Sequence, residues 1–553
     1  PYDEKGVQIG PRRWHAKIKH GTFNVRSAPL AYWPYSSTDF EQGHTALRRA
    51  TVGRNRRLGW GGETEWHLFR LLGLVRPEGY RGRLDLNYYE RGPFVGARVW
   101  YTRRNYSGYS MAYGLIDQEK EDDFGEERKN VSAPETRGRV LMRHKHYLPK
   151  DWTLQFELSY LCDRNFLEQF FRDEFVAGKE QETLLYARKQ RDQWAFTSLL
   201  KHRLNRFQQQ TESAPDLGFY LIGQPLAEDL VNVYSESHAG VKHFREPNFR
   251  RNLSGSRHFG RFDTRNEVDT LLRLGPVRMV PYAAGRATYW DDAPLDGEHC
   301  RTWGQLGVRA STDIWRVYDN AESRLWDVHR LKHVMTPEVA AFIGDTGGVM
   351  PEDLFPMDPD IEEHMRRQGG VAIALYQRLL TKRGPAGNRE SVDWMRFNII
   401  AGFYDNGPDT QTSDGRYFTY RPEYSLGRNH INAEYFWNIS DATMLLADAN
   451  YDIDSDAIRR LNVGLSVVRN PRLKYYLGWR WLRDLDSSVG TLGFNYKLTR
   501  KYTLNVFEQF DFDFDGRKCL VTEVGITRKF PPVSYTHLRA HETSLHLVCR
   551  LLL

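Results

Sequence analysis

Apolar and polar residues alternate along much of the chain, and the alternation is clearest in its last third. In residues 461–467, 473–481 and 491–499, every second residue is apolar, and most residues between them are polar or glycine. Residues 502–514 repeat the pattern, with Glu508 as its exception. Successive side chains of a β-strand point to opposite faces, so each segment predicts a strand with one apolar and one polar face.

The length and number of these segments predict the fold class. Each runs for about ten residues, which exceeds the ~5–6 of globular strands and matches the 9–11 that cross a membrane obliquely. Roughly two dozen such segments lie between residues 58 and 530, as in the largest outer-membrane barrels. A β-sandwich of so many long strands would need a very thick apolar core. The sequence therefore predicts an all-β protein, a large antiparallel transmembrane β-barrel of about 24–26 strands, in the cell outer membrane.

Turns and loops fit this barrel. Tight-turn pairs separate many of the segments, at Asp296-Gly297, Asn406-Gly407, Asp414-Gly415, Asn470-Pro471 and Asp515-Gly516. Longer polar connections at residues 119–137, 244–256 and 346–367 suit the long loops of one barrel end. Helical periodicity is scarce, and the best candidate is a helix over residues 164–176 with Asp163 as its N-cap.

Composition supports the barrel and excludes other classes. The 553 residues include 30 Tyr, 29 Phe and 15 Trp, far more than a disordered chain carries. The longest apolar stretches are about half of the ~20 residues that a membrane-spanning helix needs. A formal charge of +7 is too small for a chain of this length to indicate a nucleic-acid partner.

No motif predicts a catalytic residue, a cofactor or a metal site. Residues 511–516 match the first half of a calcium-binding EF-hand loop, but the position of the essential glutamate is Thr522, and the flanks alternate as strands. His144 and His146 share one side of a strand without a third ligand. The pairing of Cys162, Cys300 and Cys519 stays open, because their spacing matches no metal or redox motif. The sequence therefore predicts a protein that is not an enzyme.

The two ends of the chain differ from the middle. Residues 1–50 contain two closely spaced prolines, which suit an edge strand or a linker, and predict the end of a preceding domain. Residues 51–532 form the predicted barrel. Residues 533–553 lose the alternation and end in an apolar run, which is typical of a tail that does not belong to the native protein.

Several segments resemble the lipopolysaccharide-assembly (LptD) family of outer-membrane proteins. Pro29-Leu30-Ala31-Tyr32-Trp33-Pro34-Tyr35 resembles the strand where that family's periplasmic β-jellyroll meets its barrel. Four further segments resemble elements of the same family: Cys162-Asp163-Arg164-Asn165-Phe166-Leu167 with Phe170-Phe171, His333-Val334-Met335-Thr336-Pro337-Glu338-Val339, Tyr420-Arg421-Pro422-Glu423-Tyr424, and the closing hairpins of residues 493–530. In the first of these, Cys162 stands where the family has a Ser. The resemblance covers about residues 1–532. It implies that residues 1–50 are the end of a jellyroll whose larger part is missing. It also implies that the last barrel strand is missing.

The resemblance also implies a function and partners. It implies a translocon that inserts lipopolysaccharide into the outer leaflet of the outer membrane, with outer-membrane lipid around it. Its other partners would be a plug lipoprotein (LptE-like) and a periplasmic jellyroll bridge protein (LptA-like). Pro29, Tyr32, Pro34 and Tyr35 would line the substrate path, and Lys474, Arg480, Asn495 and Lys497 would face the lumen.

Two other function classes remain open from the sequence. An outer-membrane porin or plugged receptor for small solutes would share the alternating strands and would conduct without a lipoprotein partner. A soluble all-β protein that binds or cleaves polysaccharide would need no detergent for purification.

Overall fold

The computed structural model describes residues 15–25, 28–39, 46–55, 57–124, 128, 130–176, 179–228, 230–248, 257–292, 299–349, 368–385, 387–405, 429–483, 486–512 and 518–529. Within these ranges there are three short helices: α1 (Leu68–Leu71), α2 (Phe166–Phe170) and α3 (Arg172–Val176). The first half of the strands comprises β1 (His15–Val25), β2 (Ala28–Asp39), β3 (Leu47–Asn55), β4 (Gly59–His67), β5 (Tyr80–Tyr89), β6 (Gly92–Thr102), β7 (Tyr106–Ile116), β8 (Glu121–Asp122), β9 (Val131–Ser132), β10 (Thr136–Leu148), β11 (Trp152–Leu161), β12 (Thr183–Arg191), β13 (Trp194–His202), β14 (Gln210–Leu226) and β15 (Val231–Arg245). The second half comprises β16 (Arg257–Asp269), β17 (Leu272–Leu274), β18 (Val277–Trp290), β19 (Cys300–Ser311), β20 (Ile314–Ser323), β21 (Val328–Gly348), β22 (Gln368–Arg383), β23 (Glu390–Tyr404), β24 (His430–Ser440), β25 (Thr443–Asp452), β26 (Ala457–Asn470), β27 (Leu473–Leu482), β28 (Ser487–Lys497), β29 (Tyr502–Asp511) and β30 (Lys518–Lys529).

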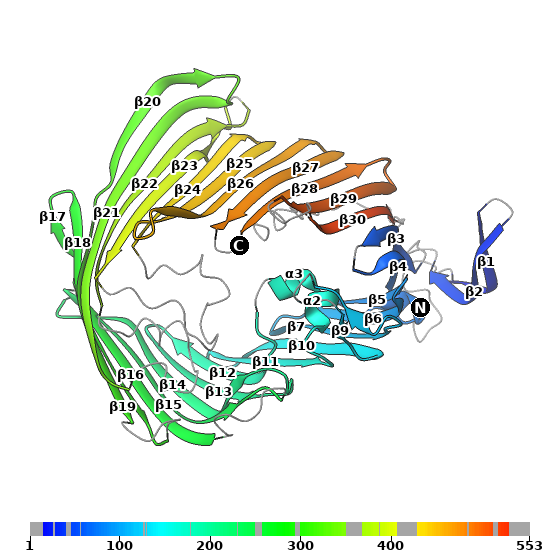
Figure 1. Ribbon diagram of the computed structural model, residues 1–553, viewed down its shortest axis with the longest axis horizontal. Helices are drawn as coiled ribbons and strands as arrows, with labels where there is room; N and C mark the ends of the chain where they lie inside the picture. Colours follow the sequence, from blue (N-terminus) through cyan, green and yellow to red (C-terminus); the bar gives the residue numbers. More distant parts are fainter. Residues whose placement is uncertain are drawn as a thin grey trace, which may run out of the picture.

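The strands from β3 onward, except β8 and β9, form one closed antiparallel barrel (Figure 1). The closed sheet contains 26 strands. Two of them, β17 and β20, pair with a single neighbour, β18 and β21 respectively, so 24 strands make up the ring. The predicted all-β fold and the predicted strand number are both confirmed.

The barrel closes between its first and last strands. β3 pairs with β30 in register from Arg49 opposite Lys529 to Asn55 opposite Glu523. On the inner face, the Thr51 hydroxyl lies 3.0 Å from the Thr527 hydroxyl and links the two strands. The prediction that the last strand is missing is therefore wrong, because β30 completes the ring.

Large apolar side chains point outward from the barrel wall, as the alternation predicts. A lipid environment favours apolar side chains on this face, so that only every second residue of each strand needs to be apolar. Members of this outer set include Val52, Val95, Val140, Leu185, Phe219, Phe262, Leu306, Ile343, Ile373, Phe403, Leu477, Trp479, Leu492 and Ile526. The protein is an outer-membrane β-barrel. In the described part of the chain, no helix has the length and apolar character to cross a membrane.

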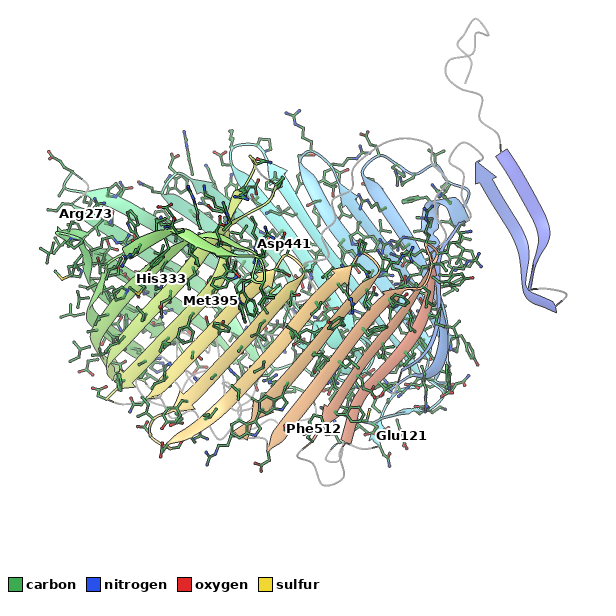
Figure 2. The ribbon with its side chains drawn as sticks, turned by 90° about the horizontal axis from the view of Figure 1, so that it is seen from above. Glu121, Arg273, His333, Met395, Asp441 and Phe512 are labelled. Carbon is green, nitrogen blue, oxygen red and sulfur yellow. The ribbon has the colours of Figure 1, made fainter. Side chains whose placement is uncertain are left out.

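The two ends of the barrel carry connections of different length. Figure 2 shows Asp441, in the short β24–β25 turn, and Phe512, which follows β29, at opposite ends of the slanted strands. At the Asp441 end, the Asn470 side-chain oxygen accepts hydrogen bonds from the backbone N–H groups of Arg472 and Leu473, which tightens the predicted Asn470-Pro471 turn. The strand ends that border the three predicted long connections all lie at the other end. Outer-membrane barrels place short turns in the periplasm and long loops outside the cell, so the Phe512 end is the extracellular end.

The N-terminal hairpin lies outside the barrel sheet. β1 and β2 pair only with each other, from His15 opposite Asp39 to Val25 opposite Ala28. Figures 1 and 2 both show this hairpin to one side of the barrel, outside the ring of strands. Its assignment to a jellyroll stays a prediction. The barrel strands run from Leu47 to Lys529, and the predicted tail of residues 533–553 lies outside the described residues.

Candidate functional site

A segment of the chain between β11 and β12 folds into the barrel lumen. Residues 162–176 and 179–182, here called the lumenal insert, include α2 and α3, which lie inside the ring of strands (Figure 1). The sequence predicted one helix over residues 164–176. The structure has two, because the backbone at Phe171 leaves the helical region, and Asn165 rather than Asp163 is the N-cap of α2.

An aromatic and aliphatic core fastens the insert to the wall. Phe166 is fully buried and Leu167 is 6% exposed. They pack with inward-facing residues of β6, β7, β10 and β11, namely Phe94, Met111, Tyr113, Leu115, Leu141 and Leu161. Each fully buried side chain of this kind contributes about 1.5–3 kcal/mol relative to exposure, so the insert is docked by burial as a soluble core would be.

A buried network of charges joins the insert, the wall and the β8–β9 hairpin. Arg91 donates to Asp117 through Nε at 3.0 Å and to Asp122 at 2.9 Å. Arg137 donates to Asp122 at 2.9 and 3.0 Å and, in bidentate fashion, to Asp163 of the insert at 2.9 Å through both Nε and Nη2. Both arginines and the first two aspartates are almost fully buried. Removing one partner from such a network leaves an uncompensated buried charge.

This environment shifts the pKa values of two groups that lie outside the strands, Asp117 and Cys162. Burial alone would raise the pKa of Asp117, but hydrogen bonds from Arg91 and Arg137 outweigh it and hold that pKa below its usual value. Burial, together with the hydrogen bond that Cys162 donates to Asp163, raises the pKa of Cys162 to about 12. The thiol is therefore protonated and unreactive at neutral pH.

The C-terminal helix of the insert has its own ion pair. Arg139 donates to both carboxylate oxygens of Glu174 in α3, at 2.7 and 3.0 Å. Burial would raise the pKa of Glu174, but the bonds from Arg139 outweigh it and lower that pKa. The Arg139 guanidinium also lies 4.6 Å from the centroid of the Phe171 ring, so one wall residue holds the insert by charge and by cation–π contact.

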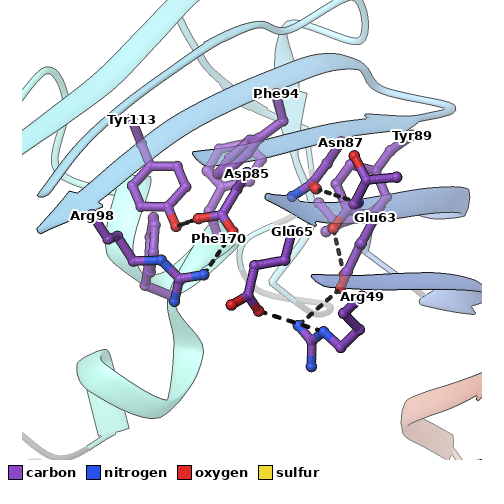
Figure 3. Close-up of a pocket in the computed structure, with 13 residues that line it drawn as sticks. Arg49, Glu63, Glu65, Asp85, Asn87, Tyr89, Phe94, Arg98, Tyr113 and Phe170 are labelled. Atoms are coloured by element: carbon purple, nitrogen blue, oxygen red, sulfur yellow. Dashed lines mark hydrogen bonds and ion pairs between the residues drawn. The ribbon is translucent and has the colours of Figure 1, made fainter. Parts of the chain in front are cut away.

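A cavity of about 160 Å³, here called the lumenal cavity, lies between the insert and strands β3 to β7 (Figure 3). Its aromatic lining comes from both the wall and the insert: Tyr89, Phe94, Tyr113, Phe170 and Phe171. The Tyr113 ring fits because its register partner is Gly96, where an added Cβ would lie 1.9 Å from the ring. Its charged and amide lining comes from the wall: Arg49, Glu63, Glu65, Asp85, Asn87 and Arg98.

The charged groups of the cavity are already paired. Asp85 accepts from Arg98 at 2.7 Å and from the Tyr113 hydroxyl. Glu65 contacts Arg83 at 3.0 Å as well as Arg48. These pairs leave a polar wall with little uncompensated charge next to an aromatic wall. Such a site can hold a small solute by hydrogen bonds and ring contacts.

The structure places the four residues predicted to face the lumen on one side of β27 and β28. Lys474 lies opposite Asn495 in the register, and Arg480 and Lys497 share their face. The opposite face of β27 carries Leu477, which is 46% exposed. Asn495 also donates a side-chain hydrogen bond to Asn505. A functional role for these four residues stays a prediction.

The other residues singled out in the sequence do not come together in a site. Pro29, Tyr32, Pro34 and Tyr35 lie in β2, outside the barrel sheet, and their place on a substrate path stays a prediction. The rings of His144 and His146 lie 5.7 Å apart, and His144 is within hydrogen-bond distance of the Tyr101 hydroxyl. Across the described ranges, no group of three or more His, Cys, Asp or Glu side chains is placed to hold a metal ion. Cys162, Cys300 and Cys519 are free thiols in this part of the chain.

Comparison with known proteins gives structural likenesses and no sequence family. No family model matches the chain, and no curated protein matches it. Among solved structures, the chain is similar to the alcaligin outer-membrane receptor FauA from Bordetella pertussis, with 10% identity over 87% of this chain and 75% of that chain and a TM-score of 0.30. It is similar to the siderophore receptor PirA from Pseudomonas aeruginosa, with 9% identity over 88% and 81% of the two chains and a TM-score of 0.32. It is also similar to the ferripyoverdine receptor of Pseudomonas aeruginosa, with 10% identity over 94% and 76% and a TM-score of 0.33.

These findings correct the predicted family and its partners. The chain matches no family model, and these solved structures are siderophore receptors rather than lipopolysaccharide translocons, so membership of the LptD family is contradicted. The predicted function in lipopolysaccharide insertion is therefore wrong as well. The same holds for the predicted partners, which were lipopolysaccharide, an LptE-like plug lipoprotein and an LptA-like bridge protein. The physical reason is that the matching segments are short runs of aromatic residues, prolines and paired charges, which large barrels use generally at strand ends and lumen walls.

Sequence reasoning missed the residues that form the site. The charged network joins positions 91, 117, 122, 137 and 163, which lie on different strands and loops. One local pattern was available: Arg137, Arg139, Leu141 and Arg143 occupy every second position of β10. Three arginines on one face of a transmembrane strand indicate that their carboxylate partners lie in the lumen.

Proposed function

We propose that this protein is an outer-membrane channel or plugged receptor for small polar solutes, and that the lumenal insert narrows its path. The observation that carries this proposal is the docking of the insert, a covalent part of the chain, by a buried core and a buried charge network. A wide barrel without internal material would leak. Here α2 and α3 occupy part of the lumen.

The chemistry of the inner wall supports the same proposal. Inward-facing positions of several strands carry ion pairs, such as Arg286 with Asp263 and Arg460 with Asp448. Interleaved charges of both signs keep the path hydrated, which favours polar solutes and disfavours acyl chains. The proposed role needs no chemical step.

The test uses the purified full-length chain reconstituted alone in planar lipid bilayers and in vesicles. We expect discrete ion conductance without any added lipoprotein, and vesicle swelling in small neutral solutes that declines with solute size. Residues of the barrel wall far from the insert, such as Arg378, serve as controls. Absence of conductance and swelling, both in the parent protein and in a variant whose insert is released, would overturn the proposal.

A further inference from the structure

The lumenal cavity has the size of one small ring-shaped molecule. Its volume is about 160 Å³, the space of roughly five water molecules at ~30 Å³ each. Drug-sized ligands occupy pockets of about 300–1,000 Å³, so they are too large for it. The half-exposed Arg49 and Glu63 side chains, each 41% exposed, mark its open side, while Glu65 and Asp85 lie deep.

Two neighbouring wall residues keep hydrogen-bonding capacity toward the cavity. Glu63 and Asn87 are register partners on β4 and β5. Glu63 accepts from the Tyr89 hydroxyl through Oε1 at 2.7 Å, while its Oε2 lies 4.0 Å from Arg49, beyond hydrogen-bond distance. The Asn87 side-chain oxygen accepts from the Thr64 backbone N–H at 3.2 Å, and its amide N–H groups have no partner among the described residues. An acceptor and a donor thus lie side by side, which is the arrangement that two adjacent hydroxyl groups require.

The aromatic wall provides the second half of the recognition. The Phe94 ring centroid lies 5.1 Å from that of Tyr113 and 5.9 Å from that of Phe170. Aromatic side chains of this kind supply a large apolar contact area. A hydroxylated ring has C–H groups on its faces and hydroxyl groups at its edge, so one face can contact the aromatic rings while the edge meets Glu63 and Asn87.

The charge balance selects a neutral molecule. Asp85, Glu65 and Glu63 already have arginine partners, namely Arg98, Arg83 and Arg49, so an ionic solute would lose hydration without gaining a free counter-charge. Resting on the proposed function, we propose that the lumenal cavity binds a neutral hydroxylated ring, a single sugar unit, held at adjacent hydroxyls by Glu63 and Asn87 against Phe94 and Phe170.

The test measures glucose binding to the purified full-length chain by equilibrium dialysis, in a detergent without a sugar headgroup. The variants are Asn87→Leu and Glu63→Gln. The matched control is Asn398→Leu, because Asn398 and Glu434 form a similar register pair on β23 and β24, at 3.3 Å, away from the cavity. The heat-dependent gel shift of a folded barrel verifies that each variant is folded, and Glu63→Gln replaces Asn87→Leu if the latter does not fold.

We expect saturable glucose binding that weakens at least tenfold in Asn87→Leu or Glu63→Gln and less than twofold in Asn398→Leu. Glucosamine, a cation, and glucose 6-phosphate, an anion, should bind at least tenfold more weakly than glucose. The inference would be overturned by a lack of saturable glucose binding, by glucose binding in the cavity variants equal to that of the parent protein, or by either charged sugar binding more tightly than glucose. Conductance without glucose binding refutes this inference alone, whereas glucose binding without conductance or swelling refutes the proposed function alone.

Discussion

Arg137 is the residue whose loss should release the lumenal insert without opening the barrel. It contacts three carboxylates, those of Asp117, Asp122 and Asp163, and its side chain is fully buried. In Arg137→Leu, Arg91 still contacts Asp117 and Asp122, but Asp163 of the insert loses its arginine. Leaving a buried charge without its partner costs about 3–5 kcal/mol.

This cost is comparable to what holds the insert in place. Full burial of Phe166 and Leu167, for example, contributes about 1.5–3 kcal/mol each. A loss of about 3–5 kcal/mol raises the undocked population by a factor of about 10²–10⁴, at 1.4 kcal/mol per tenfold. The barrel ladder, whose hydrogen bonds run between strands, is unaffected by this change.

Amide hydrogen exchange measures the undocked population directly. In α2, the amides of Gln169 and Phe171 donate to the carbonyls of Asn165 and Leu167 and should lose protection by that factor. The control is Arg378→Leu, since Arg378 pairs with Asp393 at 2.8 Å in an ion pair that is half-exposed. An exposed pair contributes about 0–1 kcal/mol, so protection should change by less than about fivefold. Unchanged protection of α2 in folded Arg137→Leu, or an equal loss across all barrel strands, would refute this reasoning.

Three further outcomes follow from the same structure. Phe166→Ala should cost about 3–5 kcal/mol of docking free energy and lower the hydrogen-exchange protection of α2 and α3, while the heat-dependent gel shift of the barrel persists. Protection equal to that of the parent protein would contradict the packing of Phe166 in the core. Leu477→Arg on the lipid face should reduce folding into lipid vesicles by about 2–4 kcal/mol, whereas Thr491→Arg on the inner face of β28 should cost less, and equal costs would count against the assigned faces. The pKa values of Asp117 and Glu174 are lowered in the folded protein, so their contribution to docking is complete above the ordinary carboxyl pKa and is lost as the pH falls through the folded-state values. Single-channel conductance should therefore rise on acidification from about pH 6 to about pH 3. A transition centred near neutral pH would point to other groups.

The barrel was predictable because lipid acts on every strand in the same way. A residue such as Leu477 or Leu492 must face the hydrocarbon, and its neighbours must face water, so the pattern repeats along the chain. The position of the Asn470-Pro471 turn was predictable for a similar reason, since both residues restrict the backbone locally. These features depend on neighbours in the sequence or on a uniform solvent.

The lumenal insert was not predictable because its stability depends on partners from distant strands. The alternation of β10 shows that Arg137 and Arg139 face inward, but nothing near them in the sequence identifies Asp163 or Glu174 as their carboxylates. The same limitation explains why the predicted family membership was wrong. Cys162-Asp163-Arg164-Asn165-Phe166-Leu167 was a matching motif, and in this fold its Asp163 and Phe166 are the residues that fasten the insert to the wall. A motif with a structural task of this kind can serve in any barrel whose lumen must be narrowed. It therefore indicates how the lumen is filled, and the cargo has to be inferred from the side chains beside it that keep hydrogen-bonding capacity, here Glu63 and Asn87.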